Sequence, residues 1–210
     1  MNNISLKSWS LETRVIDLIQ EIGQLFDDCN LCYGHGTDNP LDEAAALVLF
    51  VLGIDYLDAE EPSFSKVSAV EFKLIEKLVD QRIQERKPLA FLTQEAFFCG
   101  YKFYVDERVL IPRSPMAELI RNLFEPWIDS ASVERVLDVA TGSGCLAVAI
   151  AKNFPGAEVV ASDVSEGALE VASINVDGLS VREQVTLVES DLFENIEGVF
   201  DLIVSNPPYV

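Results

Sequence analysis

The sequence has few basic residues. Its 15 Lys and Arg stand against 35 Asp and Glu, which gives a formal net charge of -20. A surface this acidic repels phosphate backbones, so the composition disfavours direct nucleic-acid binding and suits a basic protein partner. The same acidity can also serve only to keep a protein soluble.

Long apolar runs, a leader segment and a cysteine framework are also missing. No stretch approaches the roughly 18 apolar residues of a membrane span, and the N-terminus lacks the basic start and apolar core of a signal peptide. Four cysteines in 210 residues do not make a disulfide framework. We therefore expect a cytoplasmic protein without membrane association, built as one large or two small domains.

The first part of the chain has helical periodicity. Apolar residues over Leu11–Leu25 fall on one helix face, with Ser10 as its cap. A second helix over Pro40–Gly53 is apolar nearly all round, which predicts burial. The stretch Ser68–Pro88 predicts a third helix, because its first residue and Glu71 fit a capping box.

The pattern then changes to strands. Aromatic and β-branched residues on both sides of Gly100 predict a β-hairpin. A helix "MAELIRNLFEPW" follows Ser114 and Pro115, and strands then alternate with helices. We expect strands over 133–139, 158–162, 185–189 and 200–204, and helices over 145–153 and 166–176. This alternation predicts the α/β class with a doubly wound parallel sheet.

The first strand of this sheet ends in a turn that can bind a ligand. Asp138 stands at the end of the strand, and Gly142 and Gly144 follow in a tight loop before a helix. Glycines there allow close approach of a ligand, and the helix N-terminus offers free N–H groups. Asp163 ends the next strand, 21 residues after Gly142, where a carboxylate can accept hydrogen bonds from both hydroxyls of a ribose. Asp191 ends the third strand, so three acidic strand ends line one crevice.

Two classes of ligand fit this turn. Residues Gly142–Ala147 satisfy the Gly-x-Gly-x-x-Gly/Ala pattern of dinucleotide-binding proteins, which keeps a nicotinamide oxidoreductase open. Such an enzyme would need a Tyr-Lys pair or a histidine beyond the sheet, and none precedes Val210. Asp138 favours the other class, because a carboxylate suits an ammonium, such as that of S-adenosylmethionine, better than a pyrophosphate.

The fourth strand leads to "NPPY". The Asn206 side chain and the Pro207 carbonyl are two acceptors close together, which can hold an –NH₂ group by both hydrogens. Pro207 and Pro208 stiffen the loop, and stiff positioning of reactants lowers a barrier. Tyr209 can pack against a planar group. The motif therefore predicts a planar amide or amine acceptor and an electrophilic methyl.

These motifs together resemble a known family. "DVATGSGC", Asp163, Asp191 and "NPPY" resemble the class I S-adenosylmethionine-dependent methyltransferases of planar exocyclic nitrogens, which act on nucleic-acid adenine or on protein glutamine. The net charge of -20 favours protein. The stretches Tyr33–Ala44 and Phe97–Pro115 closely resemble the bacterial glutamine methyltransferases of the third large-subunit ribosomal protein. The release-factor branch lacks the "YGHGTDNP" stretch, but it remains the alternative together with the adenine enzymes.

The resemblance implies methyl transfer to a glutamine of a basic ribosomal protein, with S-adenosylhomocysteine as product. It implies a helical substrate-recognition domain over 1–94, a β-hairpin linker over 95–113 and a Rossmann-like S-adenosylmethionine-binding domain over 114–210. The implied cofactor-binding residues are Asp138, Ala140, Thr141, Gly142, Ser143, Gly144, Cys145, Asp163, Asp191, Leu192 and Asn206. The implied catalytic residues are Asn206, Pro207, Pro208 and Tyr209, and Tyr33, His35 and Arg113 are implied in substrate recognition.

Other readings carry less weight. Cys29, Cys32 and His35 have a spacing that suggests a zinc site. A structural zinc site requires four ligands, and no second ligand pair follows, so we expect no metal. Cys145 has no base beside it and is expected to pack rather than react. A non-catalytic adapter would not need the intact acidic and glycine set. Family members continue for roughly another half-domain, so we expect only the first four strands here and no activity from this chain alone.

Overall fold

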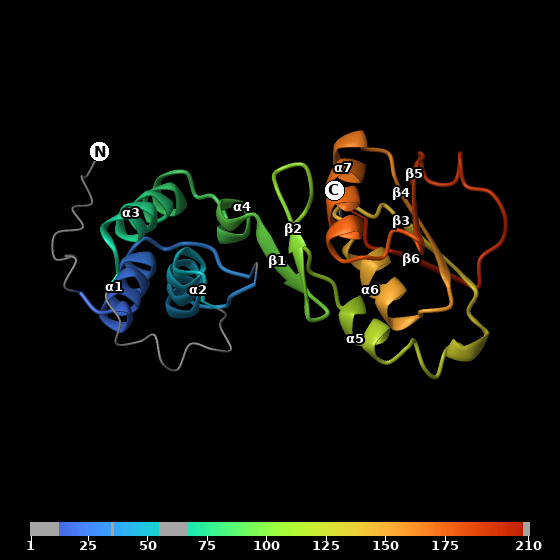
Figure 1. Ribbon diagram of the computed structural model, residues 1–210, viewed down its shortest axis with the longest axis horizontal. Coiled ribbons are helices and arrows are strands. Elements are labelled where there is room, and N and C mark those ends of the chain that lie inside the picture. Colours follow the sequence, from blue (N-terminus) through green and yellow to red (C-terminus); the bar gives the residue numbers. More distant parts are fainter. Residues whose placement is uncertain (1–12, 35, 55–66, 208–210) are drawn as a thin grey trace. The chain divides into compact units, whose positions relative to one another are not determined.

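The computed structural model describes residues 13–34, 36–54 and 67–207, and the chain divides into two compact units, Met1–Thr93 and Gln94–Val210 (Figure 1). The predicted helical N-terminal region and the α/β class with a parallel sheet are both confirmed. Within the described residues, no helix is long and apolar enough to cross a membrane.

The first unit is helical. Its described elements are α1 (Val15–Asp28), α2 (Pro40–Leu52), α3 (Ala69–Gln84) and the short α4 (Leu89–Thr93). The expected capping box at Ser68 and Glu71 is present at the start of α3, and Gly53 ends α2 with a φ of 66°. The predicted cap Ser10 and the first apolar residue Leu11 lie outside the described residues.

A buried ion pair lies inside the helical unit. Arg82 of α3 donates to Glu43 of α2, and both side chains are almost fully buried. Arg82 also donates to the Cys32 carbonyl at 2.8 Å, and Thr37 donates to Glu43 at 3.2 Å. The pair therefore anchors both sides of the loop between α1 and α2.

The second unit begins with a hairpin and a short helix. Strands β1 (Glu95–Phe98) and β2 (Tyr101–Tyr104) pair antiparallel, and α5 (Met116–Arg121) follows. The sequence predicted this helix to reach Trp127, but it ends six residues earlier. Leu123 and Phe124 have positive φ angles, and Pro126 lacks the N–H that a helix interior needs.

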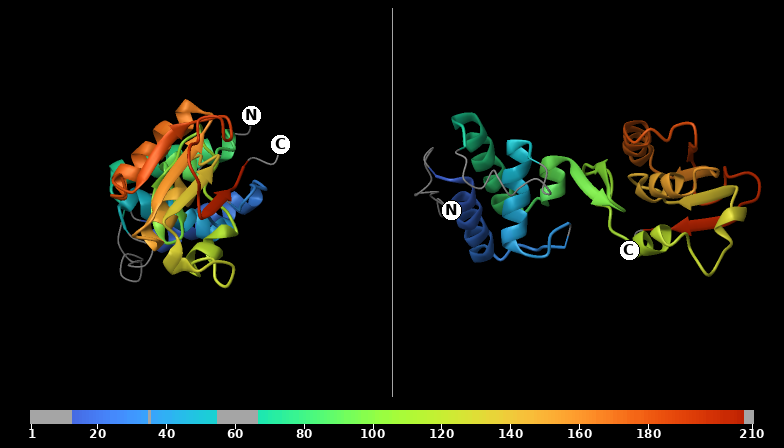
Figure 2. Two further views of the ribbon diagram at one scale, coloured as in Figure 1. Left: turned by 90° about the vertical axis from the view of Figure 1, so that its right-hand side faces the viewer. Right: turned by 60° about the horizontal axis from the view of Figure 1, so that its bottom comes forward.

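The rest of the second unit is built around a four-stranded parallel sheet (Figure 2). The strands are β3 (Arg135–Val139), β4 (Glu158–Asp163), β5 (Val185–Glu189) and β6 (Leu202–Ser205), in the spatial order β5-β4-β3-β6. The helices between them are α6 (Cys145–Asn153) and α7 (Glu166–Gly178). Predicted and observed strand bounds differ by no more than two residues. The direction of winding reverses between β3 and β6, and ligands bind at such a reversal.

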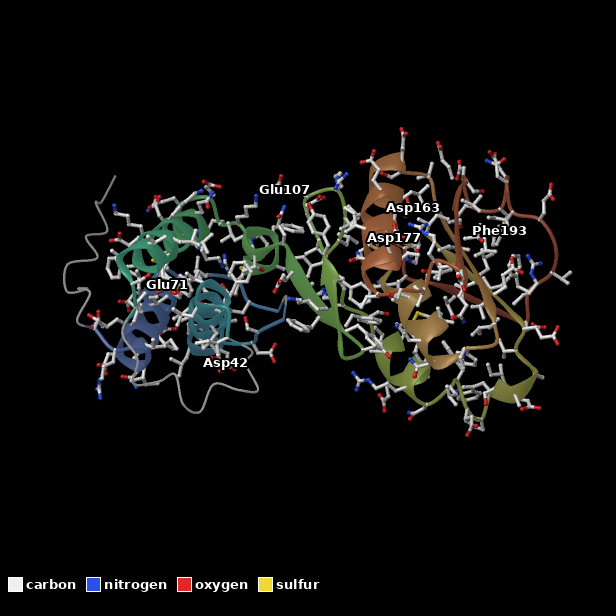
Figure 3. The ribbon with its side chains drawn as sticks, viewed as in Figure 1. Asp42, Glu71, Glu107, Asp163, Asp177 and Phe193 are labelled. Carbon is white, nitrogen blue, oxygen red and sulfur yellow. The ribbon has the colours of Figure 1, made fainter. Side chains whose placement is uncertain are left out.

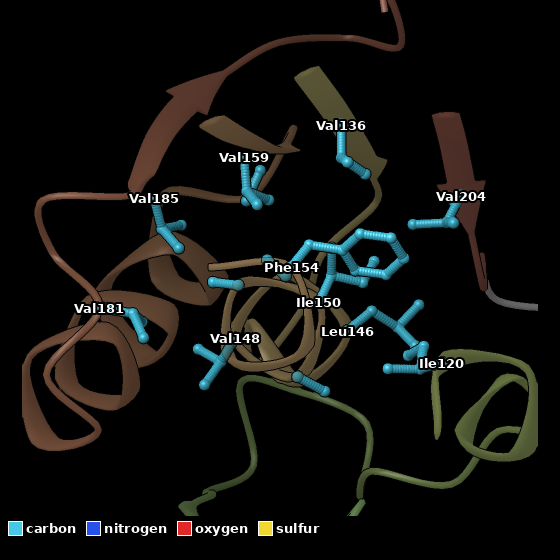
Figure 4. Packing of buried hydrophobic residues seen from close by; sticks show 14 of the residues in the cluster. Ile120, Val136, Leu146, Val148, Ile150, Phe154, Val159, Val181, Val185 and Val204 are labelled. Carbon is cyan, nitrogen blue, oxygen red and sulfur yellow. The ribbon is translucent and has the colours of Figure 1, made fainter. Parts of the chain in front are cut away.

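The core of this unit lies between the sheet and its helices. Valines from all four strands point towards α6, whose Leu146 and Ile150 pack against them (Figure 4). The described helices α5, α6 and α7 lie on this one face (Figure 4). On the other face, Ile196 and Phe200 pack over buried residues of β3 and β4. Both faces of the central strands are thus covered, which explains their continuous apolar sequence.

Candidate functional site

The loop between β3 and α6 is shaped by residues with positive φ. Ala140, Gly142 and Gly144 have φ angles of 59°, 55° and 77°. A Cβ built on Gly144 would lie 3.1 Å from the Cβ of Ala172 on α7, so Gly144 also permits a close approach of loop and helix. The loop therefore forms the tight turn before α6 that the glycines of the sequence indicate.

Asp138 lies beneath this loop and is fully buried. Its Oδ2 accepts from the Thr141 hydroxyl at 2.6 Å and from the Ala147 N–H at 3.1 Å. Its Oδ1 is buried and has no hydrogen-bond partner among the described residues. Burial, the largest cause, raises the pKa of Asp138 to about 7. The free oxygen can accept from a donor that comes from outside the loop, such as an ammonium.

Asp163 joins the ends of two strands. Its Oδ2 accepts from the Gly142 N–H at 2.9 Å, and its Oδ1 accepts from the Ser165 N–H at 3.0 Å. Because β3 and β4 are parallel neighbours, the spacing of 21 residues places Asp163 directly beside the glycine loop. A carboxylate has about four lone-pair positions, so acceptor capacity remains for ligand hydroxyls.

The segment after β5 adds an exposed apolar pair. Asp191 is exposed, and Leu192 and Phe193 expose 62% and 57% of their surface (Figure 3). Ser190 holds the segment next to Asp163, because its N–H donates to the Asp163 carbonyl at 3.0 Å. Phe193 was not predicted as a site residue, although an apolar pair directly after an acidic strand end was a usable signal.

The strand β6 brings Asn206 to the same edge. Ser205 pairs with Val139 of β3, and its hydroxyl donates to the Val139 carbonyl at 2.8 Å. Asn206 therefore follows β6 where Ala140 follows β3, and the two positions flank the reversal of the sheet. Pro207 is exposed, and Pro208 and Tyr209 lie outside the described residues.

Cys145, at the first position of α6, has a thiol enclosed by protein atoms. Burial, the largest cause, raises the pKa of this thiol to about 12, so the thiolate that a nucleophile requires is not populated near neutral pH. Cys145 therefore contributes packing and loop shape, in line with the sequence-based expectation.

The predicted substrate residues belong to different units. The Tyr33 hydroxyl is buried without a hydrogen-bond partner among the described residues, and burial raises its pKa. Arg113 is exposed in the second unit, and His35 lies outside the described residues. Among residues 13–34, 36–54 and 67–207, no three His, Cys, Asp or Glu side chains form a group that could hold a metal ion.

Comparisons with known proteins agree on one enzyme class. The family "Methyltransferase small domain" matches residues 118–210. The ribosomal protein uL3 glutamine methyltransferase of Neisseria meningitidis serogroup B is 43% identical over 205 residues, which covers 94% of this chain and 66% of the relative. The enzyme of the same name from Neisseria gonorrhoeae is 42% identical and is covered to 67%. The chain thus spans about two thirds of the length of these curated relatives.

Solved structures of methyltransferases are similar to part of the chain. The 16S rRNA N2 G1207 methyltransferase of T. thermophilus, in complex with AdoMet and guanosine, is 24% identical with a TM-score of 0.46, over 55% of this chain and 32% of that one. The ribosomal protein L11 methylase of Lactobacillus delbrueckii is 31% identical with a TM-score of 0.37, over 44% of this chain and 45% of that one.

Proposed function

The chain belongs to the family of ribosomal protein uL3 glutamine methyltransferases, and we propose that the protein methylates the side-chain amide nitrogen of a glutamine in that ribosomal protein. The observation that carries this proposal is the 43% identity over 94% of the chain. The alignment is much longer than the methyltransferase domain at residues 118–210, so the similarity includes the helical unit as well.

S-adenosylmethionine is the proposed methyl donor, and when bound it supplies an electrophilic methyl group. The loop around Asp138, Gly142 and Gly144 fits its amino-acid part, because Asp138 Oδ1 is a buried acceptor to which no described residue donates. Asp163 fits the ribose hydroxyls, since both its oxygens retain acceptor capacity. Leu192, together with Phe193, offers an exposed apolar surface for the planar base.

The remaining residues of the proposed loop set contribute shape and contacts. Ala140, Thr141, Ser143 and Cys145 complete the turn, and Thr141 and Ser143 are buried within it. Asp191 lies two residues after the end of β5, later than the sequence predicted, and is proposed as a further acceptor. Arg113, Tyr33 and His35 are proposed to contact or position the protein substrate.

Asn206 and the Pro207 carbonyl are proposed to bind the two hydrogens of the glutamine amide. An amide nitrogen is a poor nucleophile, because its lone pair is delocalised into the carbonyl, and no strong base is needed before attack. As the nitrogen forms its new bond, its hydrogens become acidic and these acceptors bind them more tightly, which stabilises the transition state. Pro208 is proposed to stiffen the loop, and Tyr209 is proposed to pack against the planar amide. S-adenosylhomocysteine is the proposed second product.

The charge of the chain supports a basic protein substrate. With 35 acidic and 15 basic residues, the protein attracts a basic ribosomal protein and repels nucleic acid. We further propose that the helical unit recognises the substrate, while the second unit binds the cofactor. The hairpin β1–β2 follows the helical unit in the chain and precedes the sheet.

The test is a methyl-transfer assay with the full-length protein. It is incubated with labelled S-adenosylmethionine and, separately, with purified uL3, a peptide release factor and adenine-containing DNA, and the label is located by mass spectrometry. Label on one glutamine of uL3 supports the proposal. Label on the release factor or on DNA would keep the chemistry and refute the substrate.

A further inference from the structure

Asn175 is a buried amide, and no motif in the sequence marks it as a functional residue. It lies on α7 and exposes 3% of its surface. Its Oδ1 accepts from the Tyr104 N–H at 2.7 Å, and its Nδ2 donates to the Tyr104 carbonyl at 2.9 Å. The same Nδ2 donates to the Ser143 carbonyl at 2.8 Å. One side chain thus bonds to the hairpin and to the glycine loop at once.

The chemistry of this position calls for an amide. Tyr104 presents a backbone donor and acceptor side by side, and only a group with one acceptor and one donor satisfies both. The second amide hydrogen then satisfies the Ser143 carbonyl, so every hydrogen-bonding group here has a partner. Aspartate would keep the acceptor, but it would set a carboxylate against two carbonyl oxygens.

The hairpin is held against α7 at a second point. Arg108, four residues after Tyr104, forms ion pairs with Asp106 and with Glu170 of α7. The strand β2 and helix α7 are in contact, and both lie in the second unit (Figure 1). The hairpin therefore packs as part of the cofactor unit, and Asn175 is the side chain that extends this packing to the glycine loop.

We propose that Asn175 is a positioning residue for the loop that binds S-adenosylmethionine, and that it couples the conformation of the hairpin to the shape of that loop. This inference rests on the proposed function, since it assumes that the loop holds the cofactor. Loss of the amide removes the hydrogen bond to the Ser143 carbonyl, so the glycine loop becomes more mobile at Ser143. Cofactor binding weakens as a result, while the affinity for the protein substrate stays nearly the same.

The test compares Asn175→Ala with Gln184→Ala in the full-length protein. Gln184 is the matched control, because its side-chain amide also bonds to backbone carbonyls of the second unit, at Ala151, Phe154 and Ala157. It precedes β5, at the edge of the sheet opposite the glycine loop. Both variants lose buried or half-buried amide hydrogen bonds, but only one of these amides contacts the loop.

Two readouts are measured for each variant. We expect Asn175→Ala to weaken equilibrium binding of S-adenosylmethionine by about fivefold, the value of one hydrogen bond, and Gln184→Ala to leave it unchanged. In the protein without ligand, amide hydrogens of the loop peptide exchange faster only in Asn175→Ala. The KM for S-adenosylmethionine rises, and the KM for uL3 does not.

The outcomes separate this inference from the proposed function. Equal weakening in both variants, or unchanged loop exchange in Asn175→Ala, would overturn the positioning role and leave the function standing. Failure of the unchanged protein to bind S-adenosylmethionine would overturn both. Normal cofactor binding without methylation of uL3 would overturn the proposed substrate. The comparison of the two variants would still decide the role of Asn175.

Discussion

Replacing Asp138 by Asn should remove the pH dependence that this buried carboxyl imposes on stability. The pKa of Asp138 rises from 3.8 to about 7 on folding, chiefly because the group is buried. The folded state therefore holds a proton that the unfolded state has released, and stability from this group is lost as pH rises from about 4 to about 7. At about 1.4 kcal/mol per pKa unit, with a slope that falls near the folded pKa, the interval from pH 5 to pH 7 costs about 2 kcal/mol.

The Asn variant does not titrate. Its amide oxygen can accept from Thr141 and from Ala147, while its NH₂ group takes the position of the oxygen that no described residue contacts by a hydrogen bond. An unpaired buried donor costs about 1–3 kcal/mol at every pH. We therefore expect the variant to be less stable than the unchanged protein at pH 5, and to gain about 3 kcal/mol relative to it by pH 8.

The assay is urea unfolding at several pH values, followed through amide exchange in peptides of β3 and α6. The difference between the two proteins isolates Asp138, since all other titrating groups are shared. Asp201→Asn is the control of opposite sign, because backbone N–H groups of Arg135 and Glu134 lower the pKa of Asp201. Parallel stability profiles for Asp138→Asn and the unchanged protein would refute the buried, partly protonated carboxyl. The same variant should also bind S-adenosylmethionine more weakly, because the acceptor that we propose for its ammonium is gone.

Three further changes test other parts of the molecule. Gly144→Ala should destabilise the second unit by about 2–4 kcal/mol in urea unfolding, and Gly142→Ala by only about 1–2 kcal/mol. Both glycines have positive φ, but only a Cβ on Gly144 would meet a neighbouring residue. Equal losses would contradict the close approach of loop and helix. Asn206→Ala should lower kcat in methyl transfer by about 100-fold or more with little change in cofactor affinity, and the reverse pattern would contradict its role on the amide. Glu43→Leu should cost the helical unit about 3–5 kcal/mol in thermal unfolding, because Arg82 stays buried without its partner, and a loss below 1 kcal/mol would show that the pair is dispensable.

Local signals in the sequence predicted most of the fold. The capping box at Ser68, the stop at Gly53 and the strand–helix alternation each depend on a few neighbouring residues, and all three were confirmed. The helix that begins at Met116 was predicted too long, because its apolar periodicity continues beyond Arg121. There the positive φ angles and Pro126 outweigh that periodicity.

The candidate site was predictable where it follows from chain topology. A parallel sheet brings the ends of its strands to one edge, so Asp138, Asp163 and Asn206 were expected to lie near one another. The contacts of Asn175 were not predictable, since Tyr104 lies 71 residues away in the sequence and a lone Asn in a helix gives no signal. Nor could the sequence reveal that one oxygen of Asp138 would lack a partner, because that depends on how the loop closes over it.

These contacts hold the loop in one shape before any ligand arrives. Three consecutive residues, 141, 142 and 143, are each bonded to a different anchor: Asp138 of β3, Asp163 of β4 and Asn175 of α7. A loop fixed from three elements loses little conformational entropy on binding, so more of the contact energy appears as affinity. The folded state is destabilised in return, because it buries a carboxyl whose second oxygen has no partner among the described residues. We propose that the ammonium of the ligand pairs with that oxygen, so the atom that lowers stability at neutral pH would also favour a cationic amino-acid group.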